Sequence, residues 1–167
     1  MIINYSIYME CELNGRLIKL EDGELYWWYS HNSVGTLKNP RWIKFKQSIV
    51  KWRNKEYLRI TILGRTFKLH RVIYYIHNQE WDIYDNSKSN LIDHIDNDGL
   101  NNNIENLRVA TTQQNAWNTK AKGYMVTEWN TYRVNVRCGE IHLTKTYKTE
   151  QEAIDAVTEF KLKYHQF

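Results

Sequence analysis

The run Asp93-His94-Ile95-Asp96, followed by the turn signal Asn97-Asp98-Gly99, is the feature that most constrains this 167-residue chain. Apolar alternation predicts a strand from Leu91 to Asp96 that ends at the turn. Residues 107–110 predict a short return strand, and Thr111-Thr112 offers an N-cap for a helix that carries Asn115. The chain should therefore contain a strand–turn–strand–helix unit with polar side chains gathered near one strand end.

These side chains suit the hydrolysis of a phosphodiester. That reaction needs a cation to neutralise charge on the phosphate and a base to take a proton from water. Asp93 and the carbonyl of Asn115 are oxygen donors, which suit Mg²⁺, Mn²⁺ or Ca²⁺ better than zinc. His94 titrates near neutral pH and is the candidate base.

The same residues resemble the HNH family, the ββα-metal endonucleases, and in particular the phage-type and viral homing enzymes with Asn in place of the final His. The resemblance covers roughly residues 69–118. It implies that Asp93 and Asn115 bind the metal, that His94 is the general base and that Asn106 holds the His94 ring. It also implies Mg²⁺ or Mn²⁺ as cofactor and double-stranded DNA as partner. The alternative is a surface hairpin that is merely rich in turn residues, which four spaced matches argue against.

Composition narrows the setting. Cys11 and Cys138 are the two cysteines, too few for a disulfide framework or for paired zinc knuckles, so no structural zinc is expected. The longest apolar runs are too short to cross a bilayer, and the first ten residues lack a signal-peptide pattern. We therefore expect no membrane partner and a cytoplasmic location, in a host cell if the chain is encoded by a virus or phage.

Charge is distributed unevenly along the chain. Residues 38–71 hold eleven Lys or Arg against the single acid Glu56, whereas residues 72–110 hold seven acids against two cations. Residues 57–67 alternate like a hairpin turning near Gly64, and a cationic ribbon of this kind could lie along DNA. A half-buried sheet with a solvated outer face is the alternative. The candidate DNA contacts here are Lys44, Lys46, Lys51, Arg53, Arg59 and Arg65.

An amphipathic helix should follow the ribbon, because Leu69, Val72, Ile73 and Ile76 have the spacing of one helical face. His70 lies on this helix. A lone histidine in such a helix is more often structural than catalytic, so no catalytic role is assigned to it.

The last third predicts strands at residues 122–126, 132–137 and 141–147, and then a helix that begins at a Thr149–Glu152 capping box. This segment, roughly residues 121–167, resembles the AP2-type DNA-binding module, although Thr146 stands where that module usually has Gly. The resemblance implies that the outer face of the sheet enters the major groove, where Arg reads guanine and Asn reads adenine. Ordinary exposed strand residues are the alternative. The candidate DNA contacts are Lys120, Lys122, Trp129, Arg133, Asn135, Arg137 and Lys145.

The sequence thus predicts an α+β fold with a basic β-rich region (1–68), a ββα-metal nuclease core (69–120) and a sheet-and-helix module (121–167). The expected activity is metal-dependent, site-specific DNA cleavage of the homing type that leaves a 5′-phosphate. A monomer would nick, and a homodimer could break both strands. The alternatives are a restriction-type or host-DNA-degrading nuclease and a DNA-binding regulator with a relic site; the presence of all four matched residues favours an enzyme.

Overall fold

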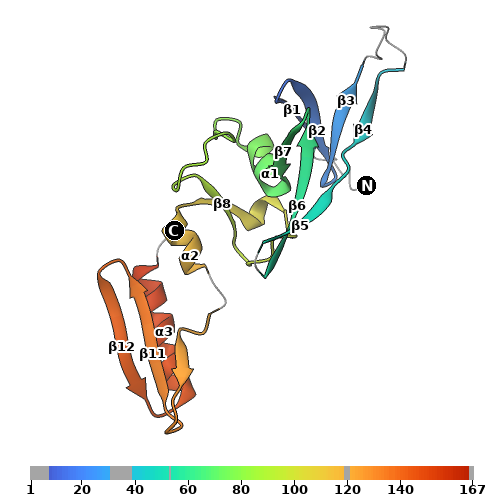
Figure 1. Ribbon diagram of the computed structural model, residues 1–167. Helices are drawn as coiled ribbons and strands as arrows, with labels where there is room; N and C mark the ends of the chain where they lie inside the picture. Colours follow the sequence, from blue (N-terminus) through green and yellow to red (C-terminus); the bar gives the residue numbers. More distant parts are fainter. Residues whose placement is uncertain (1–7, 31–38, 53, 119–120, 166–167) are drawn as a thin grey trace, which may run out of the picture. The chain divides into compact units, whose positions relative to one another are not determined.

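The computed structural model describes residues 8–30, 39–52, 54–118 and 121–165, and it divides into two compact units, Met1–Val109 and Ala110–Phe167. The α+β class is confirmed: small antiparallel sheets and short helices alternate along the chain (Figure 1). No helix in these described ranges is long and apolar enough to cross a membrane. Arg53 and Lys120, both candidate DNA contacts, lie outside the described residues.

The first unit begins with a four-stranded antiparallel sheet in the order β1-β2-β3-β4. A second, three-stranded sheet has the order β5-β6-β7, and its β6–β7 hairpin turns at Leu63-Gly64 as the alternation predicts. The strands are β1 (Tyr8–Leu13), β2 (Arg16–Glu21), β3 (Glu24–Tyr29), β4 (Arg41–Lys44), β5 (Ser48–Trp52), β6 (Lys55–Ile62) and β7 (Arg65–Lys68).

Helix α1 (Leu69–His77) closes the core of this unit, and Figure 1 shows it beside β6 and β7. Its predicted apolar face is confirmed, because Leu69, Val72, Ile73 and Ile76 are all buried. They join Leu13, Ile18 and Leu25 of the first sheet and Ile60 and Ile62 of the second in one apolar cluster. Because both sheets and α1 share this cluster, the ribbon and the segment that follows it are held as one body.

The nuclease motif follows as β8 (Leu91–His94), the 3₁₀ turn η1 (Ile104–Asn106), β9 (Leu107–Ala110) and α2 (Thr112–Trp117). Strand β8 ends at His94, two residues earlier than predicted. The Asn97 N–H donates to the His94 carbonyl at 2.9 Å, and Asn97 adopts a left-handed φ of 65°. The turn therefore starts immediately after the two predicted catalytic residues and leaves them at the end of the strand.

The second unit contains the order β10-β11-β12 and one long helix. Its elements are β10 (Tyr124–Val126), β11 (Tyr132–Cys138), β12 (Ile141–Tyr147) and α3 (Glu150–Tyr164). Both predicted caps are confirmed: Thr111 begins α2 and Thr149 begins α3 with complete capping boxes. Gly123 has φ 78°, and a Cβ there would lie 2.8 Å from Val136 and 2.9 Å from Val157, so only glycine fits where β10 meets α3.

Candidate active site

Asp93 and His94 are the last two residues of β8, and both are almost fully buried, at 3% and 5% exposure. Backbone pairing holds this strand end, since the Ile95 N–H donates to the Asn106 carbonyl at 2.9 Å. Neighbouring side chains of a strand point to opposite faces, so the two groups meet different partners. Asp93 faces a cation from β9, and His94 faces aromatic rings and the following loop.

The Asp93 carboxylate is held by Arg108. Both Nε and Nη2 of the guanidinium donate to Asp93 Oδ2, at 3.2 and 3.0 Å. The Arg108 side chain is 25% exposed, whereas the Asp93 side chain is only 3% exposed. Arg108 therefore holds the buried carboxylate from the side that faces solvent. The contact between Arg108 and Asp93 was not predicted from the sequence.

The donor set fits a hard divalent cation. Asp93 supplies a carboxylate oxygen, the kind of donor that Mg²⁺ and Mn²⁺ prefer. In residues 8–30, 39–52, 54–118 and 121–165, no three His, Cys, Asp or Glu side chains gather as a metal-binding group.

His94 Nε2 lies 3.1 Å from the amide oxygen of Asn102. An amide oxygen can only accept a hydrogen bond, so Nε2 carries the proton and Nδ1 carries the basic lone pair. Burial lowers the pKa of His94 from 6.5, although the bond to Asn102 and the charges of Asp96 and Asp93 act in the opposite direction. The neutral imidazole that a general base requires is therefore favoured near neutral pH.

Two further rings pack on His94. His70 of α1 meets it edge to face, with ring centroids 4.7 Å apart, and Tyr57 of β6 lies 6.0 Å away. His70 is 3% exposed, and among the described residues its buried Nδ1 has no hydrogen-bond partner. The pKa of His70 is lowered well below 6.5. Burial is the largest cause, and the charge of His94 is the second largest. The helix that the sequence placed before the motif thus packs directly behind the candidate base.

Asn106 braces the loop instead of touching the ring through its side chain. Its amide donates to Asp96 Oδ1 at 2.9 Å and to the Asn101 carbonyl at 2.8 Å, and its oxygen accepts from the Asp96 N–H at 3.1 Å. Hydrogen bonds to the Asp96 carboxylate from the Asp98 backbone N–H, the Asn101 side chain and the Asn106 side chain, in that order of effect, lower its pKa to about 2. Asn106 is instead linked to the His94 segment through the backbone, because its carbonyl accepts a hydrogen bond from the N–H of Ile95, the residue after His94.

The loop that carries Asn102 is packed tightly against β6. A Cβ built on Gly99 would lie 2.2 Å from the carbonyl oxygen of Glu56 and 2.8 Å from the Tyr57 ring. Lys55 Nζ also donates to Asn97 Oδ1 at 3.1 Å. Nothing in the local sequence shows this contact, because its two sides lie some forty residues apart.

The predicted DNA-contacting cations of the ribbon fall on different surfaces. Arg59 shares the exposed face of the β5–β7 sheet with Lys68, its register partner, and with Tyr57, over whose ring Lys68 Nζ lies at 4.7 Å. Since Tyr57 contacts His94, this face runs to the candidate base. Lys68, and Lys55 at the hairpin end, were not among the candidates.

The other ribbon cations point elsewhere. Lys51 pairs with Glu56 at 2.9 Å, and Lys44 pairs with Glu24 at 2.9 Å in the first sheet. Arg65 lies opposite buried Ile62 and stacks on the Tyr84 ring at 4.3 Å. Lys46 lines a cavity between the two sheets. The basic run is therefore not one continuous DNA-facing stripe.

In the second unit, Arg133, Asn135 and Arg137 share the exposed face of β11, as their alternation predicts. Their register partners on β12 are Thr146, Thr144 and His142, and His142 was not a candidate. Lys145 does not share this face, because it lies opposite buried Val134 on the side that α3 covers. Trp129 is 77% exposed in the β10–β11 turn, and Lys122 pairs with Glu150 at 3.4 Å.

Asn115 lies in α2, which belongs to the second compact unit. Trp117 at the end of this helix stacks face to face on His165, with ring centroids 4.7 Å apart and planes 6° apart. His165 itself follows α3 and packs against Phe160. The helix that carries the predicted second metal ligand is thus joined to the C-terminal module by an aromatic stack.

Comparison with known proteins agrees with this geometry. A family model described as HNH endonuclease matches residues 67–117, the segment from the end of β7 to the end of α2. An uncharacterized HNH endonuclease of Acanthamoeba polyphaga mimivirus is 37% identical over 99 residues, which cover 54% of this chain. The match spans 49% of that relative's length, and no solved structure matches the chain significantly. Residues 67–117 of this chain are therefore similar to the HNH endonuclease family.

Proposed function

We propose that this protein is a divalent-metal-dependent DNA endonuclease that hydrolyses one phosphodiester per active site. The observation that carries the proposal is the buried Asp93–His94 pair, in which Arg108 fixes the carboxylate and Asn102 assigns the histidine tautomer. HNH nucleases generally use a divalent metal and act on DNA, which supports the same reading for residues 67–117.

The reaction follows from the placement of these groups. His94 Nδ1 takes the proton from water while Nε2 stays bonded to Asn102, so the ring does not rotate as it becomes charged. Asp93 and Asn115 would hold the cation, which when bound stabilises the charge on the phosphate and the leaving 3′ oxygen. Attack on phosphorus with departure of the 3′ oxygen leaves a 5′-phosphate.

Duplex DNA would approach along the exposed face of the β5–β7 sheet. Arg59, Lys68 and Lys55 provide phosphate contacts there, and Tyr57 connects that face to His94. Phosphate contacts position DNA without reading its sequence. This surface therefore supplies affinity and leaves specificity to another part of the chain.

Specificity is assigned to the exposed face of β11 and β12. Arg133 and Asn135 can form bidentate bonds to guanine and adenine, and within the described residues Arg133 makes no ion pair, whereas Arg137 pairs with Glu140 at 4.0 Å. A separate base-reading sheet favours a long recognition site of the homing type over a short restriction site. A single active site nicks, and a double-strand break would need a homodimer or two successive nicks.

The test is nicking of supercoiled plasmid with Mg²⁺ or Mn²⁺. Asp93→Ala should abolish cleavage but keep most duplex binding, and His94→Ala should slow the single-turnover rate by about a hundredfold or more. His77→Ala is the matched control, because it removes an imidazole that no step uses. Full cleavage in excess chelator would refute the metal-dependent mechanism.

Recognition is tested by mapping cut sites across a large DNA. Alanine at Arg133 or Asn135 should relax preference at a few base pairs, by about 1–3 kcal/mol for each bidentate contact. Point substitutions are preferable to deletion of the module, because Trp117 and His165 join it to α2. An unchanged sequence profile would move specificity away from this face.

A further inference from the structure

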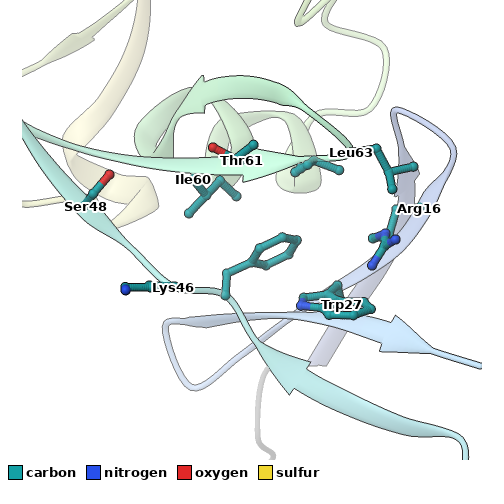
Figure 2. A pocket seen from close by; sticks show the side chains of 9 residues that line it. Arg16, Trp27, Lys46, Ser48, Ile60, Thr61 and Leu63 are labelled. Atoms are coloured by element: carbon teal, nitrogen blue, oxygen red, sulfur yellow. The ribbon is translucent and has the colours of Figure 1, made fainter. Parts of the chain in front are cut away.

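A cavity of about 450 Å³ opens between the two sheets of the first unit, away from His94 (Figure 2). Its lining includes Ile60–Leu63, from the end of β6 and the turn that follows. It also includes Ser48, the first residue of β5. Its volume falls in the range of about 300–1,000 Å³ that is usual for small-ligand sites.

The cavity is aromatic and apolar on its inner side. Phe45 and Ile60 form the floor, and Trp27 of β3 forms one wall. The Arg16 guanidinium lies 4.1 Å from the centre of the Trp27 ring, and Figure 2 shows the two side chains at one end of the cavity. Such a wall accepts a planar aromatic group by stacking.

The charge of the lining is positive. Arg16 and Lys46 are its two cations, and the lining contains no carboxylate. Neighbouring lysines differ in this respect, since Lys19, Lys44 and Lys51 each pair with a glutamate at 2.9 Å. Over the residues that the structure describes, neither Arg16 nor Lys46 makes an ion pair. A planar ligand with an attached anion would satisfy both the wall and the charge.

The cavity also adjoins the surface proposed for DNA. Ser48, which lines it, accepts a hydrogen bond from Arg59 Nε at 3.1 Å, and Arg59 belongs to the exposed face of the β5–β7 sheet. Ser48 and its hydrogen bond to Arg59 therefore connect the lining of the cavity to that face.

We propose that this cavity binds one unpaired nucleotide of the DNA substrate, with its base stacked against Trp27 and Phe45 and its flanking phosphates on Arg16 and Lys46. The inference rests on the proposed function, because it takes the polynucleotide to be DNA. A paired base is stacked inside the duplex and cannot enter, so the site takes a nucleotide from a single-stranded segment, as at an overhang or a frayed end.

The test measures binding in chelator, so it does not depend on cleavage. Fluorescence anisotropy would compare a labelled oligo-dT strand with a labelled duplex. Arg16→Gln and Lys46→Gln should each weaken oligo-dT binding by about fivefold to tenfold, and duplex binding much less. Lys44→Gln is the matched control, because it removes the same charge two residues from Lys46 where the ammonium pairs with Glu24.

Occupancy is tested by photocrosslinking full-length protein to an oligo that contains one 5-iododeoxyuridine. Crosslinks at Trp27 or Phe45 support the proposal. Crosslinks elsewhere, or equal loss of oligo binding in Lys44→Gln and Lys46→Gln, overturn it. Free thymidine monophosphate is the second arm: competition at the same concentration as the oligo would make a free nucleotide the ligand instead of DNA. Plasmid nicking without a pocket crosslink rejects only the pocket, whereas a pocket crosslink without nicking rejects only the nuclease.

Discussion

Gly99→Ala tests how the active-site loop is held. The added Cβ would lie 2.2 Å from the Glu56 carbonyl oxygen, so the loop or β6 has to move by roughly 1 Å to restore ordinary contact. The same loop carries Asn102, whose amide oxygen sets the His94 tautomer. Overpacking of this kind costs about 1–3 kcal/mol of stability. A misplacement of about 1 Å near reacting groups lowers the rate by up to about a hundredfold.

The assay is single-turnover nicking at saturating protein, with thermal unfolding and duplex binding measured in parallel. Gly139→Ala is the control: its φ of 58° makes alanine strained, but a Cβ there meets nothing within 4 Å, in a turn far along the chain from the nuclease motif. We expect Gly99→Ala to lose rate at unchanged duplex affinity, and Gly139→Ala to lose only stability. A wild-type rate for a folded Gly99→Ala protein would refute the argument that this loop positions His94.

Other perturbations test single contacts. Arg108→Gln removes the cation that pairs with buried Asp93 and should lower the unfolding free energy by about 3 kcal/mol, as measured by urea titration. The double variant with Asp93→Asn should recover most of that loss. If it recovers none, the two residues are not energetically coupled. Burial raises the pKa of Cys11 to about 11, so iodoacetamide at pH 8 should modify the half-buried Cys138 first, by mass spectrometry; the reverse order would contradict this. Because the pKa of His94 is lowered, the nicking rate should stay level down to about pH 6.5 and fall only below it, and an acid limb centred above pH 7 would require another base.

The elements of the nuclease motif were predictable because their signals are local. The spacing of Leu69, Val72, Ile73 and Ile76 alone defines α1, and a threonine cap defines the start of α2. The first sheet has a weaker signal. Lys19 is 8% exposed although charged, because its ammonium lies about 5 Å from the rings of Tyr8, Tyr26 and Trp42 and pairs with Glu21. A buried cation among aromatics gives no clean alternation, so those strands could be placed only as a basic β-rich region.

The site was predictable as a set of residue types but not as a set of contacts. Spacing identified Asp93 and His94, whereas the bond between Asn102 and His94 depends on a loop held by Gly99 against β6. The number of cations likewise predicted a basic ribbon, but it did not show which cations share a face of the sheet. Register does separate them: Arg59 shares a face with Tyr57, while Lys51 lies across from Glu56 and is neutralised there.

Helix α2 shows where motif and compact unit differ. By sequence it is the last part of the HNH match, yet it belongs to the unit that contains the C-terminal sheet. Within this unit Trp117 stacks on His165, and the sequence does not reveal the contact because the two residues lie almost fifty positions apart. An aromatic pair contributes about 0.5–1.5 kcal/mol beyond its buried area. That is enough to bias a six-residue helix that is too short to be stable alone. The C-terminal module therefore also supports the helix that carries Asn115.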